Sequence, residues 1–220
     1  MNQGLLLSRN WRDVGGYLVL EFWFATQDQP QCIQIRGERP VFFLSDHDYQ
    51  QAGNALRFAV ECRQLSLKSY AQEPVWGVYF NAWSRHQSAA YELLERGLFP
   101  LEYDIKPPDR FLMERFIRGD ASWTGGALDS RGALRNPDLR PTRVELPVKL
   151  LSFDIETNAY QNTIISIAAV TPEERAVWVV GHDTNEHFIG VGNERACIEA
   201  FLSWVRQVDP DILTGWNCIQ

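Results

Sequence analysis

Cysteine and histidine are scarce in this sequence, and their spacing excludes several kinds of site. The four cysteines include no C-x-x-C pair and lie far apart, so neither a zinc knuckle nor a disulfide framework is predicted. They are Cys32, Cys62, Cys197 and Cys218. The four histidines also lack the spacing of a zinc site, and we predict that they are surface residues. They are His47, His86, His182 and His187.

An overall basic charge and long apolar runs are also missing. The formal net charge is −7 and the pI is about 5.1, so composition alone does not indicate a nucleic-acid-binding protein. Residues 1–146 hold 17 Lys and Arg against 18 Asp and Glu, whereas residues 147–220 hold 4 against 10. No run approaches the roughly 18 apolar residues of a membrane span, and the opening residues do not form a secretory signal. We therefore predict a cytoplasmic protein with reduced thiols and no membrane partner.

What is present is a globular composition with a strand-rich first part. Hydrophobic residues make up 45% and charged residues 22%, which suits one or two cores. Alternating or β-branched runs predict four early strands. These are residues 17–25, 32–35, 41–44 and 75–80. Two helices are predicted among them, residues 46–56 capped by Ser45 and residues 84–96 closed by Gly97.

The end of this part contains prolines and glycines that predict turns. Pro107-Pro108 should stop the preceding segment, after which Asp109 caps a helix over residues 110–117. This helix should bury three side chains. They are Phe111, Leu112 and Phe116. A hairpin is predicted at Gly125-Gly126, and Pro147 marks a domain boundary.

After Pro147 the sequence predicts strands at residues 148–156, 163–170 and 176–180, joined by short turns as an antiparallel set. Residues 193–208 carry an apolar helical stripe. Its members are Ile198, Phe201, Leu202, Val205 and Val208. A fourth strand, residues 212–217, should run parallel to one of the first three. The order β-β-β-α-β is how ribonuclease-H-like nucleases begin.

Two carboxylates, Asp154 and Glu156, lie two residues apart on the first of these strands, so both should project from one face of the sheet. Such a pair suits a hard divalent cation, and paired cations can activate water and stabilise the leaving oxygen of a phosphodiester. A solvated acidic face is the alternative for so short a pattern. The boundary before the pair and the β-β-α-β order after it make the metal site about as well supported as the solvated face.

Three segments resemble the family B DNA polymerases. Phe153-Asp154-Ile155-Glu156-Thr157 matches the first exonuclease motif of this family, and residues 209–217 resemble the approach to its second. Residues 103–117 resemble the segment that precedes its exonuclease, and residues 8–13 resemble the start of bacterial DNA polymerase II. The resemblance covers most of residues 90–220, while residues 14–90 match only loosely.

The resemblance implies an α+β chain. Residues 1–146 would be a β-rich amino-terminal domain, and residues 147–220 the first part of a truncated ribonuclease-H-like (α/β) 3′→5′ exonuclease domain. Asp154 and Glu156 would be catalytic ligands of two Mg²⁺ or Mn²⁺ ions, the backbone near Thr157 would meet the primer 3′ end, and Asn217 would lie beside the single strand or support the metal shell. A longer bacterial, nucleoid-associated parent would extend DNA with deoxynucleotides and excise mismatched 3′ nucleotides.

The family's remaining motifs and its palm, fingers and thumb would follow Gln220. The resemblance therefore implies that these 220 residues alone bind metal weakly or not at all and are inactive or nearly so. It also implies contact between the amino-terminal domain and single-stranded template, although a purely structural scaffold is an alternative. Two other hypotheses stay open. One is a self-standing single-stranded nucleic-acid-binding module, and the other is a small stand-alone exonuclease, for which the residues after Pro147 are few.

Tryptophans and arginines give weaker signals. Trp23, Trp178 and Trp204 occupy apolar-periodic positions and are predicted in cores, and Trp216 is predicted as a buried ring with contact to DNA as its alternative. Seven arginines lie between Arg110 and Arg143. We predict a mixed-charge surface for that stretch, with phosphate binding as the alternative.

Overall fold

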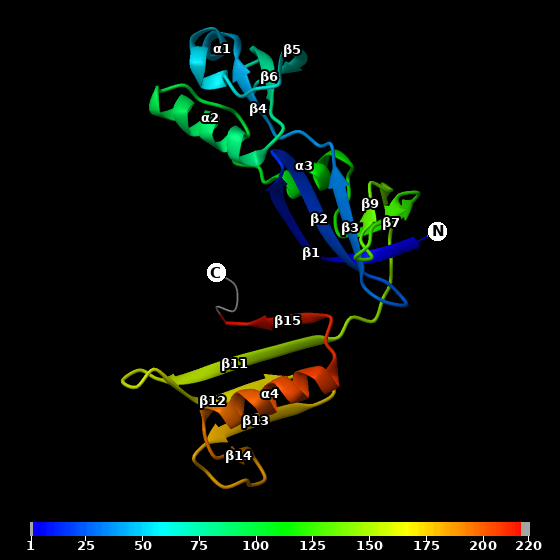
Figure 1. Cartoon of the computed structure of the whole chain (residues 1–220), viewed down its shortest axis with the longest axis vertical. Coiled ribbons are helices and arrows are strands. Elements are labelled where there is room, and N and C mark those ends of the chain that lie inside the picture. Colours follow the sequence, from blue (N-terminus) through cyan, green and yellow to red (C-terminus); the bar gives the residue numbers. More distant parts are fainter. Residues whose placement is uncertain (1, 217–220) are drawn as a thin grey trace. The chain divides into compact units, whose positions relative to one another are not determined.

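The computed structural model describes residues 2–216 (Figure 1). The chain divides into two compact units, unit 1 (Met1–Leu146) and unit 2 (Pro147–Gln220). Both units are built on β-sheets against which helices pack, which confirms the α+β class. No helix within residues 2–216 is long and apolar enough to cross a membrane.

Unit 1 contains a seven-stranded sheet in the order β10-β7-β1-β2-β3-β9-β8. Its strands are β1 (Asn2–Val14), β2 (Tyr17–Ala25), β3 (Gln31–Arg36), β7 (Asp120–Thr124), β8 (Ala127–Leu128), β9 (Leu134–Arg135) and β10 (Asp138–Pro141). Alternate residues of β2, among them Leu20 and Phe22, are fully buried on one face with Ile33 of β3. The period of two in this apolar pattern is what makes the segment a half-buried strand.

A second, three-stranded sheet in unit 1 has the order β4-β6-β5. Its strands are β4 (Val41–Ser45), β5 (Glu61–Lys68) and β6 (Pro74–Tyr79), and it packs with α1 (Asp46–Ala52), a 3-10 turn η1 (Gly53–Leu56) and α2 (Trp83–Glu95). Ser45 is the predicted cap of α1, since its Oγ accepts a hydrogen bond from the Asp48 N–H at 3.0 Å. The core of this part contains Phe42, Phe80 and Leu93.

The start of α2 is held by a residue 70 positions earlier in the chain. Ala82 occupies the N-cap position and has no side-chain acceptor. Asp13 at the end of β1 accepts hydrogen bonds from the N–H groups of Trp83 and Ser84 at 2.8 and 2.9 Å instead. Burial raises the pKa of Asp13, but the hydrogen bonds from Ser84 and Trp83 outweigh it and lower the pKa overall. A strand end therefore caps the helix.

His86 lies inside unit 1, so its prediction as a surface residue was wrong. Its ring is fully buried and stacks on Trp83 with centroids 4.5 Å apart. The ring also contacts Phe42 and Phe80. Burial, with a smaller effect from the Arg110 guanidinium, lowers the pKa of His86 to about 4. The prediction had considered only the spacing of a zinc site, whereas α2 turns His86 toward the same core as Ala89, Ala90 and Leu93.

The helix α3 (Pro107–Glu114) begins at the prolines rather than after them. Proline tolerates the first helical turn, where its missing N–H has no intrahelical partner, so Pro107-Pro108 starts this helix. Lys106 occupies the N-cap position, and Asp109 lies in the first turn. The predicted cap was therefore wrong.

The prediction that Phe116 is buried was also wrong, whereas Phe111 and Leu112 are buried as predicted. Phe116 takes a left-handed conformation with φ 56° and is 81% exposed. The N–H of Phe116 donates to Met113 O at 3.1 Å, and that of Ile117 donates to Leu112 O at 2.9 Å. This is a Schellman end, in which the chain reverses and Ile117 enters the core in place of Phe116.

Gly125 and Gly126 do not form the predicted hairpin. Strand β7 pairs with β1 and β10, while β8 pairs with β9, so the two glycines turn the chain between different ladders. Both have positive φ, and a Cβ on Gly126 would lie 2.9 Å from Arg135 O. The local sequence indicated a turn correctly but could not indicate which strands it joins.

Unit 2 is a five-stranded sheet in the order β14-β13-β12-β11-β15. Its strands are β11 (Leu150–Asn158), β12 (Thr163–Val170), β13 (Arg175–Val180), β14 (Ile189–Val191) and β15 (Ile212–Gly215). Strand β12 is antiparallel to its neighbours β11 and β13, and β15 is parallel to β11, as predicted. Strand β14, which pairs in parallel with β13, was not predicted.

The helix α4 (Glu194–Val208) lies along the sheet of unit 2 (Figure 1). Asn193 caps it, since its Oδ1 accepts from the Ala196 N–H at 2.9 Å. Its buried stripe differs from the predicted one, because Ile198 and Leu202 are 36% and 42% exposed. The side chains that meet the core are Cys197, Ala200, Phe201, Trp204, Val205 and Val208. The stripe is rotated toward Trp204, which contacts Trp178 of β13 at 5.8 Å between centroids.

Candidate functional site

The acidic pair lies on β11, where the pleat sends alternate side chains to opposite faces. Leu151 and Phe153 pack toward α4, and the Phe153 ring lies 5.4 Å from that of Phe201. The strand therefore sends Asp154 and Glu156 to the face opposite α4. Both are exposed.

Small side chains surround the pair on this face. Asp154 is paired across the ladder with Ala168, and Glu156 with Ser166. Residues directly opposite each other in an antiparallel pair have neighbouring Cβ atoms, so these small residues leave space above the carboxylates. Ile167, between the two, is buried on the other face. The sequence interpretation had not named Ser166 or Ala168, which only strand register reveals.

Within residues 2–216, neither Asp154 nor Glu156 takes part in an ion pair. Two neighbouring anions with free oxygens and open space suit a hard divalent cation by donor type. In the same part of the chain, no group of three or more His, Cys, Asp or Glu side chains could hold a metal ion. The pair therefore fits as two of the ligands of such a cation.

Strand β15 approaches β11 unusually closely beside the acidic pair. A Cβ on Gly215 would lie 2.4 Å from the carbonyl oxygen of Phe153, so only glycine permits this pairing. The β11–β15 ladder ends at the pair Phe153 and Gly215. Beyond this pair, no strand in residues 2–216 covers that edge of β11 from Asp154 onward.

Thr157 lies just past an irregularity in the ladder. The register moves from the pair Glu156 and Ser166 to the pair Thr157 and Ile164, so β12 carries one extra residue, Ile165. The N–H of Ile164 donates to the Glu194 carboxylate at 2.8 Å, which ties the bulge to the start of α4. Bulges of this kind re-aim side chains near functional sites. Thr157 is exposed there, and its predicted contact with DNA stays a prediction.

Three further residues near this site, Asn217, Trp216 and Asp211, were named in the sequence analysis or its motifs. Asn217 lies outside the described residues. Trp216 is 91% exposed, so its prediction as a buried ring was wrong. Asp211 has a structural role, since its carboxylate accepts from the Lys149 N–H at 2.8 Å and joins the turn after α4 to the start of β11.

The arginine-rich stretch of unit 1 is largely neutralised. Four of the seven arginines between Arg110 and Arg143 form ion pairs with nearby carboxylates. They are Arg110, Arg115, Arg135 and Arg140. Surface ion pairs contribute little to stability, but they reduce the charge available to phosphates. These pairs favour the mixed-charge surface over a phosphate-binding stretch.

Comparison with known proteins finds relatives that match nearly the whole chain. No family model matches it. DNA polymerase II of Escherichia coli (strain K12) is 29% identical over 231 residues, covering 99% of this chain and 28% of the relative. A DNA polymerase of Archaeoglobus fulgidus is 23% identical, covering 98% of this chain and 29% of the relative. The family B DNA polymerase of Pyrobaculum calidifontis shares the fold with a TM-score of 0.72 at 16% identity. The matched region covers 99% of this chain and 30% of that structure.

These relatives agree on one class of protein, the DNA polymerases. Within that class the chain is similar over its length to the amino-terminal part of the family B enzymes, which confirms the resemblance predicted from residues 8–13, 103–117, 153–157 and 209–217. The chain spans less than a third of the length of each relative.

Proposed function

We propose that these 220 residues are the amino-terminal part of a cytoplasmic DNA polymerase with 3′→5′ proofreading exonuclease activity. Unit 1 is its amino-terminal domain, and unit 2 begins its exonuclease domain. The observation that carries the proposal is the pair Asp154 and Glu156, two exposed carboxylates on one face of β11, in a chain that matches DNA polymerases along its length.

In this proposal Asp154 and Glu156 supply two carboxylate ligands for Mg²⁺ or Mn²⁺. When bound, such ions provide a nucleophile and stabilise the leaving oxygen during phosphodiester hydrolysis. The chain's own groups position the DNA. The edge of β11 near Thr157 presents backbone groups to the 3′-terminal nucleotide, and the space over Ala168 and Ser166 admits its phosphate.

Two carboxylates alone hold such an ion weakly, because affinity rises with ligand number and charge. We therefore propose that the 220 residues by themselves have little or no nuclease activity and that further ligands come from a longer protein. The polymerase activity, with its deoxynucleotide substrates and primer–template DNA, also belongs to that longer protein.

The test uses the longer protein containing this chain and a 3′-labelled oligonucleotide with Mg²⁺. Asp154→Ala and Glu156→Ala should each reduce release of the label on the order of a thousandfold, because a metal ion contributes several kcal/mol to the transition state and about 1.4 kcal/mol changes the rate tenfold. Glu173→Gln removes an exposed acid of the same unit from the β12–β13 turn and should leave degradation unchanged.

Primer extension, measured in parallel, separates loss of the nuclease from loss of folding. Extension should continue in both alanine variants. The proposal fails if degradation persists in the Asp154→Ala protein, or if Glu173→Gln lowers it equally.

A further inference from the structure

A groove lies on the outer face of the three-stranded sheet of unit 1. Phe42 and Leu44 of β4 belong to the core, so the pleat turns Phe43, between them, to the opposite face. The walls of the groove come from the β5–β6 turn, from the segment around Leu101 and from α3. Its volume of about 1010 Å³ is at the top of the range of small-molecule pockets, about 300–1,000 Å³, so several side chains fit into it. We call it the sheet groove.

Large apolar and aromatic side chains line the sheet groove and stand in solvent. Tyr70 in the β5–β6 turn is fully exposed, Phe99 is 66% exposed and Leu67 is 59% exposed. The turn is closed by a hydrogen bond from the Ser69 N–H to Glu73 O at 2.9 Å, so it holds Tyr70 at a defined place on the rim. Exposed apolar side chains that gather around one hollow mark a binding surface, whereas scattered ones do not.

The sheet groove also carries an excess of negative charge. Its acids are Asp48, Glu73, Glu102 and Glu114, and its bases are Lys68 and Arg110. Arg110 is paired with Glu102 at 2.8 Å and lies 3.8 Å from Glu114. Within residues 2–216, neither Asp48 nor Glu73 forms an ion pair. Carboxylates in the groove are therefore left without a cation.

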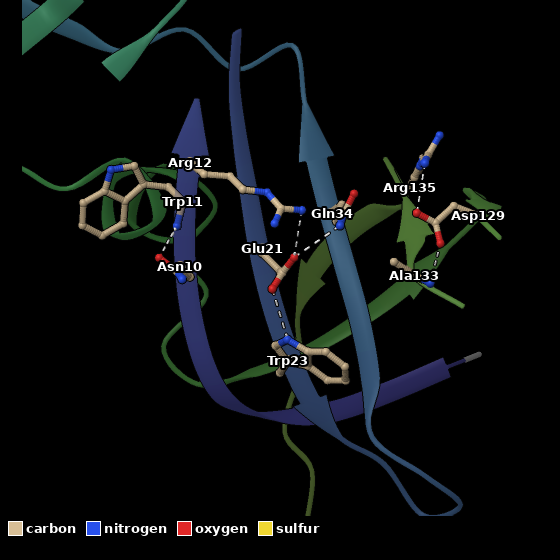
Figure 2. A network of polar contacts seen from close by, with 9 residues as sticks. All are labelled: Asn10, Trp11, Arg12, Glu21, Trp23, Gln34, Asp129, Ala133 and Arg135. Carbon is tan, nitrogen blue, oxygen red and sulfur yellow. Dashed lines mark hydrogen bonds and ion pairs between the residues drawn. The ribbon is translucent and has the colours of Figure 1, made fainter. Parts of the chain in front are cut away.

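Two carboxylates on the seven-stranded sheet of the same unit are compensated by their neighbours (Figure 2). Glu21 accepts hydrogen bonds from Trp23 Nε1 at 3.3 Å and from Gln34 Nε2 at 3.2 Å. Asp129 pairs with Arg135 at 3.0 Å. Trp23 is 40% exposed beside Glu21, so its prediction as a core residue was wrong. The unpaired acids of the sheet groove differ from these two, and they complement a cationic ligand.

We propose that the sheet groove binds a segment of a partner protein in which apolar side chains lie next to lysine or arginine. Apolar side chains of the segment fill the space between Phe43, Leu67 and Phe99, and its cations meet Asp48 and Glu73. Exposed aromatic residues such as Tyr70 are frequent anchors of protein interfaces. Phosphates would meet like charge in this groove, which is costly, so its charge selects a basic peptide over a nucleic acid.

The sheet groove lies wholly within unit 1 and uses neither Asp154 nor Glu156. Its occupation by a partner therefore does not depend on the proposed nuclease activity. Because the chain spans less than a third of each relative, another segment of the longer protein is the alternative occupant. The experiment has to separate that segment from a partner protein.

The test measures fluorescence anisotropy with the longer protein containing this chain. The probe is a labelled peptide of about ten residues in which leucine and phenylalanine alternate with lysine. The same peptide with glutamate in place of lysine should bind at least about tenfold more weakly, because it repels the acids of the groove. Tyr70→Ala should weaken binding of the lysine peptide about tenfold. Tyr160→Ala, the matched control, removes an equally exposed tyrosine from unit 2 and should leave binding unchanged.

A second pair of variants tests the charge of the groove. Glu73→Gln should lower the affinity for the lysine peptide about threefold, as expected for one solvent-exposed ion pair. Glu95→Gln, which removes an exposed acid at the end of α2 outside the groove, should not. The inference is overturned if the two peptides bind equally, if the wild-type protein binds neither, or if the control variants lower the affinity as much as Tyr70→Ala and Glu73→Gln.

Hydroxyl-radical footprinting of the same longer protein identifies the occupant. Tyr70 should be oxidised in the free protein, since it is fully exposed, and should be protected once the lysine peptide is added. If Tyr70 is already protected without the peptide, a segment of the longer protein fills the sheet groove, and binding of a partner there is refuted.

Discussion

Replacing His86 with phenylalanine should remove one component of the pH dependence of unit 1. The His86 ring is fully buried against Trp83, Phe42 and Phe80, and its Nε2 has no hydrogen-bond partner among the described residues. Burial lowers its pKa from 6.5 to about 4. Phenylalanine keeps an aromatic ring in this place but cannot be protonated.

The direction in which pH changes the stability follows from the lowered pKa of His86. Above pH 6.5 His86 is neutral in the folded and unfolded states, so the full stability is present. As the pH falls toward about 4, the unfolded chain takes up a proton that the folded chain refuses, and stability is lost. With about 1.4 kcal/mol per pKa unit, the loss is about 3 kcal/mol, and it stops once both states are protonated.

Two measurements check this magnitude. Hydrogen exchange of peptides from α2 should show that protection in the wild type falls on acidification more than in His86→Phe, after correction for intrinsic exchange. Histidine ring resonances should show one group titrating near pH 4 that is absent from the variant. If all four histidines titrate near 6.5, or if the stability difference between the two proteins is constant with pH, the assignment of a buried neutral His86 is wrong.

Two further substitutions test backbone features. Gly215→Ala places a Cβ 2.4 Å from Phe153 O and should destabilise unit 2 by about 1 to 3 kcal/mol in urea unfolding, whereas Gly192→Ala, which meets nothing within 4 Å, should change it little. Equal effects of the two would contradict the close approach of β15. Phe116→Gly should stabilise unit 1 by about 1 kcal/mol, because glycine adopts the left-handed conformation at the end of α3 without strain. Met113→Gly, on the exposed side of that helix, should instead destabilise it by about 1 kcal/mol, and a less stable Phe116→Gly protein would refute the argument.

Strand periodicity predicted several elements with correct bounds. The alternating pattern of residues 17–25 predicted β2, and that of residues 163–170 predicted β12. Each of these strands has one face in a core and the other in solvent, which produces the alternation. Strand β1 was missed, since its residues are mostly polar and only partly buried. It forms because β2 pairs with most of its length and β7 pairs with its first residues, which is information that its own sequence does not contain.

The acidic pair could be predicted because residues two apart on a strand point to the same face, whichever strands it pairs with. Its surroundings could not be, since Ala168 and Ser166 reach it through a register that includes the bulge at Ile165. His86 and Phe116 failed for a related reason. His86 was judged only from the missing spacing of a zinc site and Phe116 only from its place along a helix, whereas the outcome depended on tertiary packing around His86 and on the Schellman end that turns Phe116 outward.

The contact between Gly215 and Phe153 also constrains how this region can vary. Parallel pairing of β15 with β11 brings the glycine opposite one particular carbonyl, and a shift of one residue exchanges the two faces of a strand. Inserting or deleting a residue in the connection at Asp209, Pro210 and Asp211 would therefore set a bulkier side chain against that carbonyl. The length of this connection should be less tolerant of change than its composition.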